Sequence, residues 1–503
     1  MTRSILFLIA AVAAPACRNA GAAKGEPALQ RELRHDLAVL AHDSLRGRGT
    51  PSSELESAAR YVAARFAELG LEPFGGTDFI HRYAIATSQV FAESVSIAFP
   101  GAAPIRAGRE LVLVADHGAP RVASGELVVL SGSITDSSTA HLNFDGTTLV
   151  VPRPGRGLNA GELARLSNLL MWTNPHALVF VADLPHSALR AVAHRGGATR
   201  RLEWDPLDLR GATRTSHGIF LVRAGAVRRA LAAEGLDLAQ LAADTAGPLR
   251  MRRFPGRRVR AISPRRVLER QSAPNIIAVL EGGDPDLRNQ IVVVSAHLDH
   301  LGVGAPTADG DSVYNGADDN ASGVAALLAV AGRLRAGPRP HRSLLFLVTS
   351  GEETGFWGSD AFAGDPATPL ARLVANINLD GIGRPAWHDS IAVLGGAWST
   401  LGVSALEASK GARSAIAPTF APVTGYSRSD HYSFARRGIP AVHLFSGKLF
   451  PYYHTPADQV DVVDFDWLAR VAQYAHGLVG TVANQRKRPA WTDPHHPRGE
   501  VPW

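Results

Sequence analysis

Two pairs of neighbouring carboxylates stand in the second half of the chain. Asp318 and Asp319 lie in NGADDNASG, and Glu352 and Glu353 lie in SGEETGFWGS, directly after an apolar run. Two adjacent glutamates in a closed site repel each other unless a cation or a shared proton relieves them. A divalent metal lets one carboxylate bind it while the other takes a proton from water. This pattern indicates metal-assisted hydrolysis, and surface exposure of both glutamates is the alternative.

The stretch VVVSAHLDHLG adds a histidine and an aspartate two residues apart. His297 and Asp299 follow the apolar run Ile291–Val294, which predicts a strand buried on both faces. Residues two apart share a face of a strand, although only one of them need touch a metal. Because a metal-bound histidine usually donates its other ring N–H to a carboxylate, we expect Asp299 to orient His297. A capped strand end is the alternative for this pair.

The strongest signal is the set of residues rather than any pair. Asp318 and Asp319 precede a predicted helix, so taken alone they would be explained as helix-capping residues. However, Asp380 ends the apolar run VANINLD, and His454 lies in PYYHTPADQ. Ligand-type residues therefore occur in five separate loops, and the carboxyl ends of buried strands in an α/β sheet are where sites form. We expect these loops to meet.

The mixture of donor atoms narrows the choice of metal. Carboxylate oxygens combined with imidazole nitrogens suit zinc, with manganese or cobalt as substitutes. Two histidines and three carboxylates, one of them bridging, are enough for two metals about 3.5–4 Å apart. The sequence therefore predicts a site for two zinc ions per chain.

Alternating strands and helices surround these residues. Further buried strands are expected at NIIAVLEG and LLFLVTSG. One helix is expected to carry the apolar residues from Val324 to Leu334 and to end at Gly337, and another is expected at about 464–482. Two earlier amphipathic helices, between residues 28 and 69, would open the same domain. Apolar strands separated by helices predict an α/β fold with a mainly parallel, mixed sheet covered by helices on both faces.

Residues 90–261 have a different character. Short β-type runs such as ELVVLSG, TTLVVPRPG and ALVFVADL are separated by glycine and proline. A helix is predicted at 162–171, and residues 218–235 are predicted to begin as a strand and end as a helix. This composition predicts an inserted β-rich domain, which divides the catalytic domain into N-terminal helices at 28–89 and a main part at 262–484. Residues 485–503, rich in proline, arginine and histidine, are expected to be unstructured.

The first residues have the layout of an export signal. An arginine, an apolar run and small residues precede Cys17, which predicts a signal peptide at 1–17 and a linker at 18–27. AAPAC resembles the lipobox of bacterial lipoproteins, although Ala14 replaces the usual leucine. We therefore expect an exported protein that is either lipid-anchored through Cys17 at the cell envelope or periplasm, or secreted. Cys17 is the only cysteine, so no internal disulfide forms.

The charge of the chain does not indicate nucleic-acid binding. The 503 residues carry a formal net charge of +6, and basic residues cluster between Met251 and Arg266. No recognisable nucleic-acid-binding fold surrounds this cluster, so a solvated boundary between domains explains it better.

The series AHLDHLG, NGADDNASG, SGEETGFWGS, NINLDGIGR, SDHYSF and YYHTPADQ resembles the co-catalytic zinc aminopeptidases of metallopeptidase family twenty-eight. The similarity covers about Ala273 to Val482 in both order and spacing. It implies the zinc aminopeptidase fold, two zinc ions, and peptide or protein substrates with a free N-terminus. The insert resembles the protease-associated domain of many relatives.

The resemblance also implies a role for each matching residue. One zinc would be held by His297 and Asp380 and a second by Glu353 and His454. Asp319 would bridge them, since it stands four residues before a glycine in the family pattern D-x-x-S-G. Relatives often have a cis peptide bond after this aspartate, here the bond from Asp319 to Asn320.

Further matches concern proton transfer and substrate. Glu352 matches the general base, and Asp299 matches the carboxylate behind the histidine ligand. Tyr453 matches a tyrosine that stabilises the oxyanion in some members. Three residues match a motif near the substrate pocket: Asp430, His431 and Phe434.

Other functions on the same fold remain open. A glutaminyl cyclase would use a single zinc, whereas His297 and Asp380 are both retained here. A carboxypeptidase or dipeptidase of the glutamate carboxypeptidase type is another alternative. Assays with amino-blocked and carboxyl-blocked substrates would distinguish it from an aminopeptidase. A binding protein that has lost catalysis should lack ligands, and none is missing. No obligate protein partner is implied.

Overall fold

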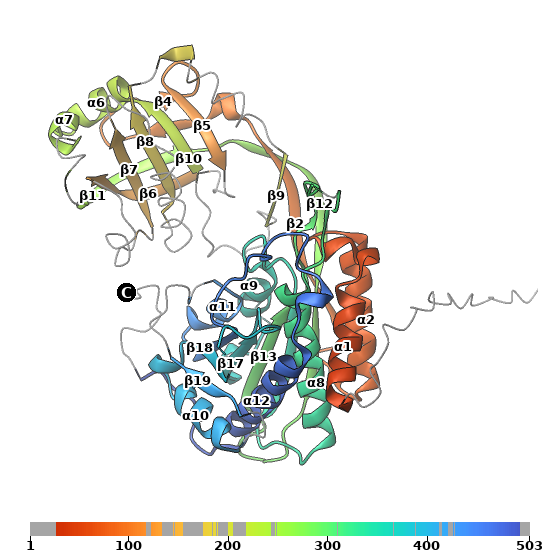
Figure 1. Cartoon of the computed structure of the whole chain (residues 1–503). Helices are drawn as coiled ribbons and strands as arrows, with labels where there is room; N and C mark the ends of the chain where they lie inside the picture. The colour runs from red at the N-terminus through yellow and green to blue at the C-terminus, as the bar shows by residue number, and fades with distance from the viewer. Residues whose placement is uncertain are drawn as a thin grey trace, which may run out of the picture.

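The computed structural model describes most of the chain (Figure 1). The described residues are 27–492 without 117–121, 133–143, 145, 154–174, 184, 188, 190–199, 205–217, 243–246, 248, 309, 366, 388, 412–414, 421–425 and 427. The predicted signal, Cys17, the linker up to residue 26 and the predicted helix at 162–171 lie outside these residues. Among the described helices, none combines the length and the hydrophobicity that crossing a membrane requires.

The larger of two extended sheets forms the centre of the domain that is predicted to be catalytic, at residues 28–89 and 262–484. This domain is called the catalytic unit below. Its strand order is β19-β18-β20-β17-β13-β16-β12-β2-β9, with β1 paired to β12. The bounds of these strands are β1 Glu72–Pro73, β2 Ile80–Val90, β9 Arg200–Trp204, β12 Arg265–Leu280, β13 Ile291–His297, β16 Ser343–Thr349, β17 Leu373–Leu379, β18 Ser390–Leu394, β19 Ala417–Thr419 and β20 Ala441–Phe445. The four strands β16, β13, β17 and β20 are parallel to one another. β12 runs antiparallel to β16, and β2 runs antiparallel to β12. The predicted mixed α/β sheet is confirmed.

Helices cover both faces of this sheet. Their bounds are α1 Ala28–Leu40, α2 Ser53–Glu68, α8 Ser322–Ala336, α9 Trp357–Gly364, α10 Leu401–Gly411, α11 His431–Ala435 and α12 Phe465–Asn484. Val292 and Val294 of β13 belong to one buried cluster with α1, α2, α8 and α12, whereas Val293 belongs to another with Phe362 of α9 and Phe434 of α11. Successive side chains of a strand point to opposite faces, so each face of β13 has its own helical layer.

The second sheet is built from the inserted segment. Its strand order is β4-β3-β11-β6-β7-β8-β10-β5. The bounds are β3 Ser96–Ala98, β4 Ile105–Arg106, β5 Leu111–Asp116, β6 Val122–Ser131, β7 Thr147–Arg153, β8 Ala177–Ala182, β10 Gly218–Arg223 and β11 Arg250–Ile262, with helices α6 Ala224–Ala232 and α7 Leu238–Ala242. Figure 1 shows this sheet and its helices as a separate lobe, joined to the catalytic unit by β2 and β12. β9 is an exception, because it comes from the inserted segment but pairs with β2.

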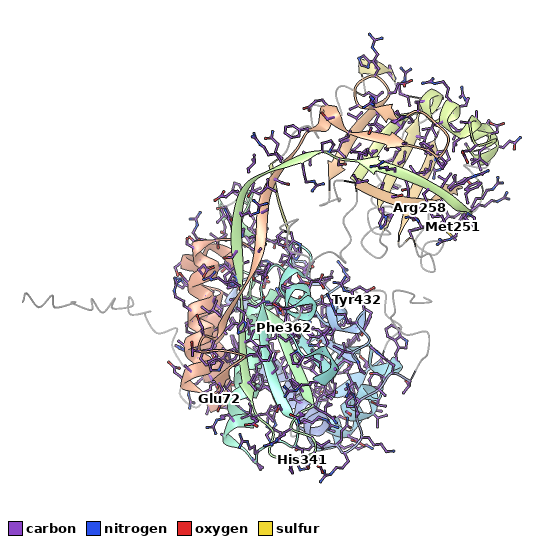
Figure 2. The ribbon with its side chains drawn as sticks, turned by 180° about the vertical axis from the view of Figure 1, so that it is seen from behind. Glu72, Met251, Arg258, His341, Phe362 and Tyr432 are labelled. Carbon is purple, nitrogen blue, oxygen red and sulfur yellow. The ribbon has the colours of Figure 1, made fainter. Side chains whose placement is uncertain are left out.

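The direction of the strands determines where a site can form. Ile276 of β12 pairs with Val348 near the end of β16, and β16 is parallel to β13 and β17. The carboxyl ends of these parallel strands therefore lie at the sheet edge from which β12 and β2 continue toward the inserted lobe. Figure 2 shows the arrangement from behind, with Met251 and Arg258 in that lobe and His341 at the opposite end of the catalytic unit.

Short elements complete the described chain. They are the paired strands β14 Gly302–Val303 and β15 Val313–Tyr314 and the short helical segments η1 Asp43–Arg48, η2 Ala92–Ser94, η4 Ala317–Ala321, η5 Leu370–Arg372, η6 Gly396–Trp398 and η7 Val460–Val462.

The prediction of an unstructured tail from residue 485 is wrong for residues 485–492. The N–H of Thr400 donates to the carbonyl of Ala490 at 2.9 Å, and the indole N–H of Trp491 donates to the carbonyl of Gly438 at 3.0 Å. Sequence composition missed this segment because its partners are distant in the chain.

Candidate metal centre

The structure brings all five predicted ligands together. His297 ends β13, Asp319 lies in η4, Glu353 follows β16 and Asp380 follows β17. His454 comes from the connection between β20 and α12. These residues belong to two clusters that could each hold a metal ion, and Asp319 belongs to both. One cluster is His297, Asp319 and Asp380, and the other is Asp319, Glu353 and His454 together with His300. The predicted gathering of separate loops at one sheet edge is therefore what the fold provides.

Four contacts within the clusters have the same length. His297 Nε2 lies 3.2 Å from Asp319 Oδ1 and 3.2 Å from Asp380 Oδ1. His454 Nε2 lies 3.2 Å from Asp319 Oδ2 and 3.2 Å from Glu353 Oε2. Two ligand atoms of one tetrahedral zinc are about 3.3 Å apart, because zinc bonds to nitrogen and oxygen are roughly 2.0–2.2 Å long. The donor atoms are spaced as ligands of a shared cation would be.

The chemistry of the donors also fits a cation. Nε2 of His454 is buried and makes no hydrogen bond within the described residues, although it faces two carboxylates. Burial alone would raise the pKa of Asp319, but the contacts with His297 and His454 hold it well below its usual value. Burial lowers the pKa of His297, yet Asp380 and Glu352 raise it more, so that it lies well above its usual value. The centre is therefore strongly negative and attracts positive charge.

Backbone contacts hold Asp319 in place. The N–H groups of Asp318 and Asp319 donate to the two carboxylate oxygens of Asp458, at 2.8 and 3.0 Å. The bond from Asp319 to Asn320 is cis, as the resemblance implies. At Gly323 a Cβ atom would lie 2.3 Å from Asn320 Oδ1, so only glycine fits at the start of α8.

Asp318 has a structural role. Its Oδ1 accepts the N–H of Gly383 at 2.6 Å, and its Oδ2 accepts the hydroxyl of Tyr452 at 3.0 Å. Burial is the largest influence on this carboxyl and raises its pKa to about 6. Of the two neighbouring aspartates, the structure therefore directs only Asp319 toward both histidines.

Asp299 does not orient His297 in the predicted way. His297 Nδ1 lies 3.1 Å from the main-chain carbonyl oxygen of Asp299, whereas the nearer carboxylate oxygen is 3.9 Å away. The carboxylate instead accepts the N–H of Glu352 at 3.2 Å and the hydroxyl of Thr50 at 3.0 Å. Burial, its main influence, raises the pKa of Asp299 to about 6. Asp299 thus orients the histidine through its backbone and the loop of Glu352 through its side chain.

Arg48 stabilises the backbone beneath the centre, and sequence analysis did not identify it. Its fully buried guanidinium donates to the carbonyls of Leu298 at 2.7 Å and Asn315 at 2.7 Å, and also to those of Leu40 and Gly316. Burial lowers the pKa of Arg48 to about 10. Because Leu298 follows β13 and Asn315 precedes η4, this arginine ties together the two segments that carry His297 and Asp319.

A cavity of about 250 Å³ opens beside the ligands. Glu352 and Tyr453 line it together with His297, Asp319 and Asp380. The ring of Tyr453 also stacks on His454, with centroids 3.8 Å apart. Apolar side chains form another part of the wall, namely Trp387, Ala392, Leu394, Phe445, Leu449 and Phe450. These wall residues come from loops and strand ends that sequence analysis did not single out.

The three residues of SDHYSF that match a motif near the substrate pocket do not line the cavity. Asp430, His431 and Phe434 are fully buried, and none of them lines the cavity among the described residues. The carboxylate of Asp430 accepts hydrogen bonds from the hydroxyls of Ser359 and Thr349, and Phe434 of α11 packs in the core with Phe362 of α9. These residues therefore belong to the buried core next to the site and not to the wall of the cavity.

His300 is a second residue that sequence analysis missed. It is buried, and its Nδ1 lies 2.7 Å from Glu353 Oε1 and 4.0 Å from Asp319 Oδ2. The signal was present, because His300 directly follows the pair His297 and Asp299 in AHLDHLG.

These observations define the class of protein. Parallel strands of a helix-covered mixed sheet deliver three carboxylates and two histidines to one edge, where they surround a place for cations beside a partly apolar cavity. This is an α/β protein with a metal-binding site at the carboxyl edge of its sheet.

Comparison with known families identifies that class further. Residues 275–479 match the sequence model of peptidase family M28. The matched segment starts in β12, ends in α12 and contains all five ligands. This part of the chain is therefore similar to peptidase family M28, the family that its motifs resemble.

Individual relatives are peptidases by name. Aminopeptidase YwaD of Bacillus subtilis is 25% identical over 228 residues, which cover 44% of this chain and 47% of that protein. Leucine aminopeptidase 1 of Trichophyton rubrum is 29% identical over 223 residues, 42% of this chain and 58% of that protein. The matches span about half the length of these curated relatives. Among solved structures, an aminopeptidase from Aneurinibacillus sp. strain AM-1 aligns with a TM-score of 0.48 at 18% identity, covering 91% of this chain and 95% of that one.

Proposed function

We propose that this protein is a zinc-dependent aminopeptidase that removes N-terminal residues from peptides with two zinc ions. The observation that carries the proposal is that the two oxygens of the Asp319 carboxylate face different histidines. Its Oδ1 lies 3.2 Å from His297 and its Oδ2 lies 3.2 Å from His454. One ion would be held by His297, Asp319 and Asp380, and the other by Asp319, Glu353 and His454.

The chain's own residues supply the proton transfer. Bound metal ions would make water more acidic and polarise the carbonyl of a peptide bond. Glu352 lines the cavity beside both clusters and takes the proton from the attacking water. It then returns that proton to the amine that leaves. The bond from the Glu352 N–H to Asp299 holds this loop in place during the transfer.

Tyr453 is suited to stabilise the oxyanion. Burial is the main influence on its hydroxyl and raises its pKa, and the neighbouring carboxylates add to the shift. The hydroxyl therefore stays protonated and can donate a hydrogen bond to the developing negative charge. Stacking on His454 fixes the ring at the edge of the cavity.

The walls of the cavity support an N-terminal residue with an apolar side chain. Trp387, Phe445 and Phe450 provide aromatic surface next to the acidic ligands. An apolar side chain would bury its surface against these rings. A free ammonium group would meet the carboxylates that line the same cavity.

One observation favours a second candidate, a carboxypeptidase or dipeptidase. Arg428 and Lys448 line the same cavity. Cations so placed could bind a free substrate carboxylate. This alternative uses the same metals and the same base. It is distinguished from an aminopeptidase only by which end of the substrate must be free.

A panel of amino-acid p-nitroanilides, with zinc counted on the same sample, tests the proposal. We expect two zinc ions per chain and the fastest hydrolysis for leucine or phenylalanine p-nitroanilide. Amino-blocked and carboxyl-blocked dipeptides are compared in parallel. Hydrolysis of only the amino-blocked peptide would favour the carboxypeptidase, and a single zinc with cyclisation of N-terminal glutamine would favour the cyclase. Metal binding without any hydrolysis would reject both peptidases.

We also propose that the protein is exported and attached to the membrane through a lipid on Cys17. The apolar run before AAPAC supports this proposal. Expression of the full chain and of Cys17→Ser, followed by fractionation, tests it. The proposal predicts that the unchanged chain sediments with membranes and that the variant is soluble. If both are soluble after signal removal, the protein is secreted. The assignment of the inserted lobe as a protease-associated domain stays a prediction.

A further inference from the structure

We propose that His300 is a positioning residue that makes Glu353 a one-oxygen ligand of the second metal. The inference rests on the proposed function, because it requires a metal between Asp319, Glu353 and His454. It assigns a role to a histidine that lies beside the expected ligands without being one of them.

The two oxygens of Glu353 face different imidazoles. Oε1 lies 2.7 Å from His300 Nδ1, and Oε2 lies 3.2 Å from His454 Nε2. The shorter distance is that of a charge-assisted hydrogen bond, about 2.7–2.9 Å, whereas the longer one equals the other ligand pairs. A carboxylate only accepts hydrogen bonds, so Nδ1 of His300 must carry the hydrogen. A ring nitrogen that carries hydrogen cannot coordinate a metal, and His300 therefore acts through Glu353.

The surrounding backbone locks the ring of His300. A Cβ atom at position 316 would lie 2.5 Å from Cγ of His300, so the chain passes the ring at Gly316, where φ is +59°. Gly316 stands three residues before Asp319, and its backbone carbonyl accepts from Arg48. The ring also meets His454 edge to face, with centroids 5.5 Å apart. The position of Nδ1 is thus fixed relative to both Asp319 and His454.

The other ring nitrogen indicates why the histidine is there. Nε2 of His300 is buried and makes no hydrogen bond to any described residue. A buried polar atom without a partner destabilises a fold, so an apolar residue would serve better as mere filling. The bond from Nδ1 to Glu353 is the favourable contact that explains a histidine at this position.

The consequence concerns the coordination of the second metal. With Oε1 held by His300, Glu353 offers only Oε2, and the protein supplies three atoms, one each from Asp319, Glu353 and His454. The first cluster also supplies three atoms, from His297, Asp319 and Asp380. Catalytic zinc sites typically keep a position free for water or substrate beside three protein ligands. His300 would preserve that free position by preventing two-oxygen binding by Glu353.

Metal binding measured without substrate tests the inference. Apoprotein is titrated with Co²⁺ against a chelator, and the absorption spectrum of each ion is recorded for the unchanged chain and for His300→Ala, His300→Asn and the distant control His476→Ala. We expect His300→Ala to weaken binding of one ion by about 10–100-fold and to alter its spectrum. The other ion should keep its affinity. His300→Asn presents an amide N–H near the place of Nδ1 and should restore most of the affinity and the spectrum.

Three outcomes would contradict the inference. His300→Ala with unchanged affinities and spectra would show that the hydrogen bond does not position Glu353. Loss of one ion in both His300→Ala and His300→Asn would indicate that His300 is itself a ligand. Equal weakening in His476→Ala would indicate a general loss of stability. If His300→Ala does not fold, His300→Leu, which retains more of the ring's volume, replaces it. Failure of the unchanged chain to bind two ions would instead reject the proposed function.

Discussion

The two sheets of this chain contain similar strands but differ in the residues at the strand ends. β13 and β16 in the catalytic unit are buried along their whole length, and so are β7 and β8 in the inserted lobe. β13 ends in His297, and β16 leads to Glu352 and Glu353. β7 ends in Arg153, whose guanidinium donates to the carbonyls of Gly132 and Pro152. Buried parallel strands therefore provide an edge at which a site can form, and the residues at their ends decide whether it forms.

The largest expected effect concerns Glu352. We expect Glu352→Gln to lower kcat/KM by about 10²–10⁴-fold, because the amide cannot accept a proton from water. Both metals should stay bound, since Glu352 belongs to neither cluster. The matched control in the inserted lobe is Glu126→Gln, which removes only a half-exposed contact with Arg253. Peptidase assays and metal analysis on both variants measure the difference. An equal loss of activity in Glu352→Gln and Glu126→Gln would contradict the expectation that only the catalytic unit takes part in hydrolysis.

Two buried arginines allow a comparison of stability. Arg48→Met would remove the hydrogen bonds from the guanidinium to four buried carbonyls, of which that of Gly316 keeps the N–H of Ala321 as a donor. We expect this change to lower the unfolding free energy of the catalytic unit by about 3 kcal/mol. It should also weaken metal binding, because the segments of Leu298 and Asn315 would no longer be linked by hydrogen bonds to the same guanidinium. Arg153→Met should cost about 1–3 kcal/mol in the inserted lobe and leave metal binding unchanged. Denaturant titration with metal analysis distinguishes these outcomes. Weaker metal binding in Arg153→Met would contradict them.

Removal of metal should affect one lobe only. At a metal concentration a hundred times the dissociation constant, each bound ion stabilises the folded state by about 2.7 kcal/mol, so two ions contribute about 5.4 kcal/mol. A chelator should then lower the Tm of the catalytic unit by roughly 10–20 °C. The inserted lobe has none of the predicted ligands, so its transition should not move. Differential scanning calorimetry of the whole chain, with and without chelator, measures both. A shift shared equally by both transitions would mean that the lobes unfold as one unit.

The smallest effect is expected on the exposed strand of the inserted lobe. Arg252 lies on β11 and is exposed. We expect Arg252→Ser to change stability by less than about 0.5 kcal/mol and to leave turnover unchanged. Thermal unfolding and a peptidase assay check this expectation. A large loss of activity would show that the surface of this lobe takes part in handling substrate.

The sequence predicted those features that local chemistry determines. His297, Asp319, Glu353, Asp380 and His454 could be identified because each is a ligand-type residue at a strand end or in a recognisable motif. The mixed sheet could be predicted because its strands are continuous apolar runs. Both kinds of signal are carried by residues close together in the chain.

Features that depend on contacts between distant segments were predicted poorly. Asp430 and Phe434 match a motif, but a motif does not reveal that α9 covers them. Trp387 and Phe450 line the cavity from two separate loops, and neither loop has a pattern of its own. The tail was expected to be unstructured because its partners at Thr400 and Gly438 are far away in sequence. For Asp299, the spacing identified the neighbour of His297 but could not distinguish its carbonyl from its carboxylate.

The connection between the lobes has a mechanical consequence. β2 and β12 stay paired from Ile80 and Ile276 up to Val90 and Arg265, so the inserted lobe is carried on an antiparallel ribbon and not on a loose linker. Large rotations of that lobe would have to twist or unzip this ribbon. A force applied to the outer lobe would thus be transmitted along β12 to β16, the strand that leads to Glu352, the proposed general base.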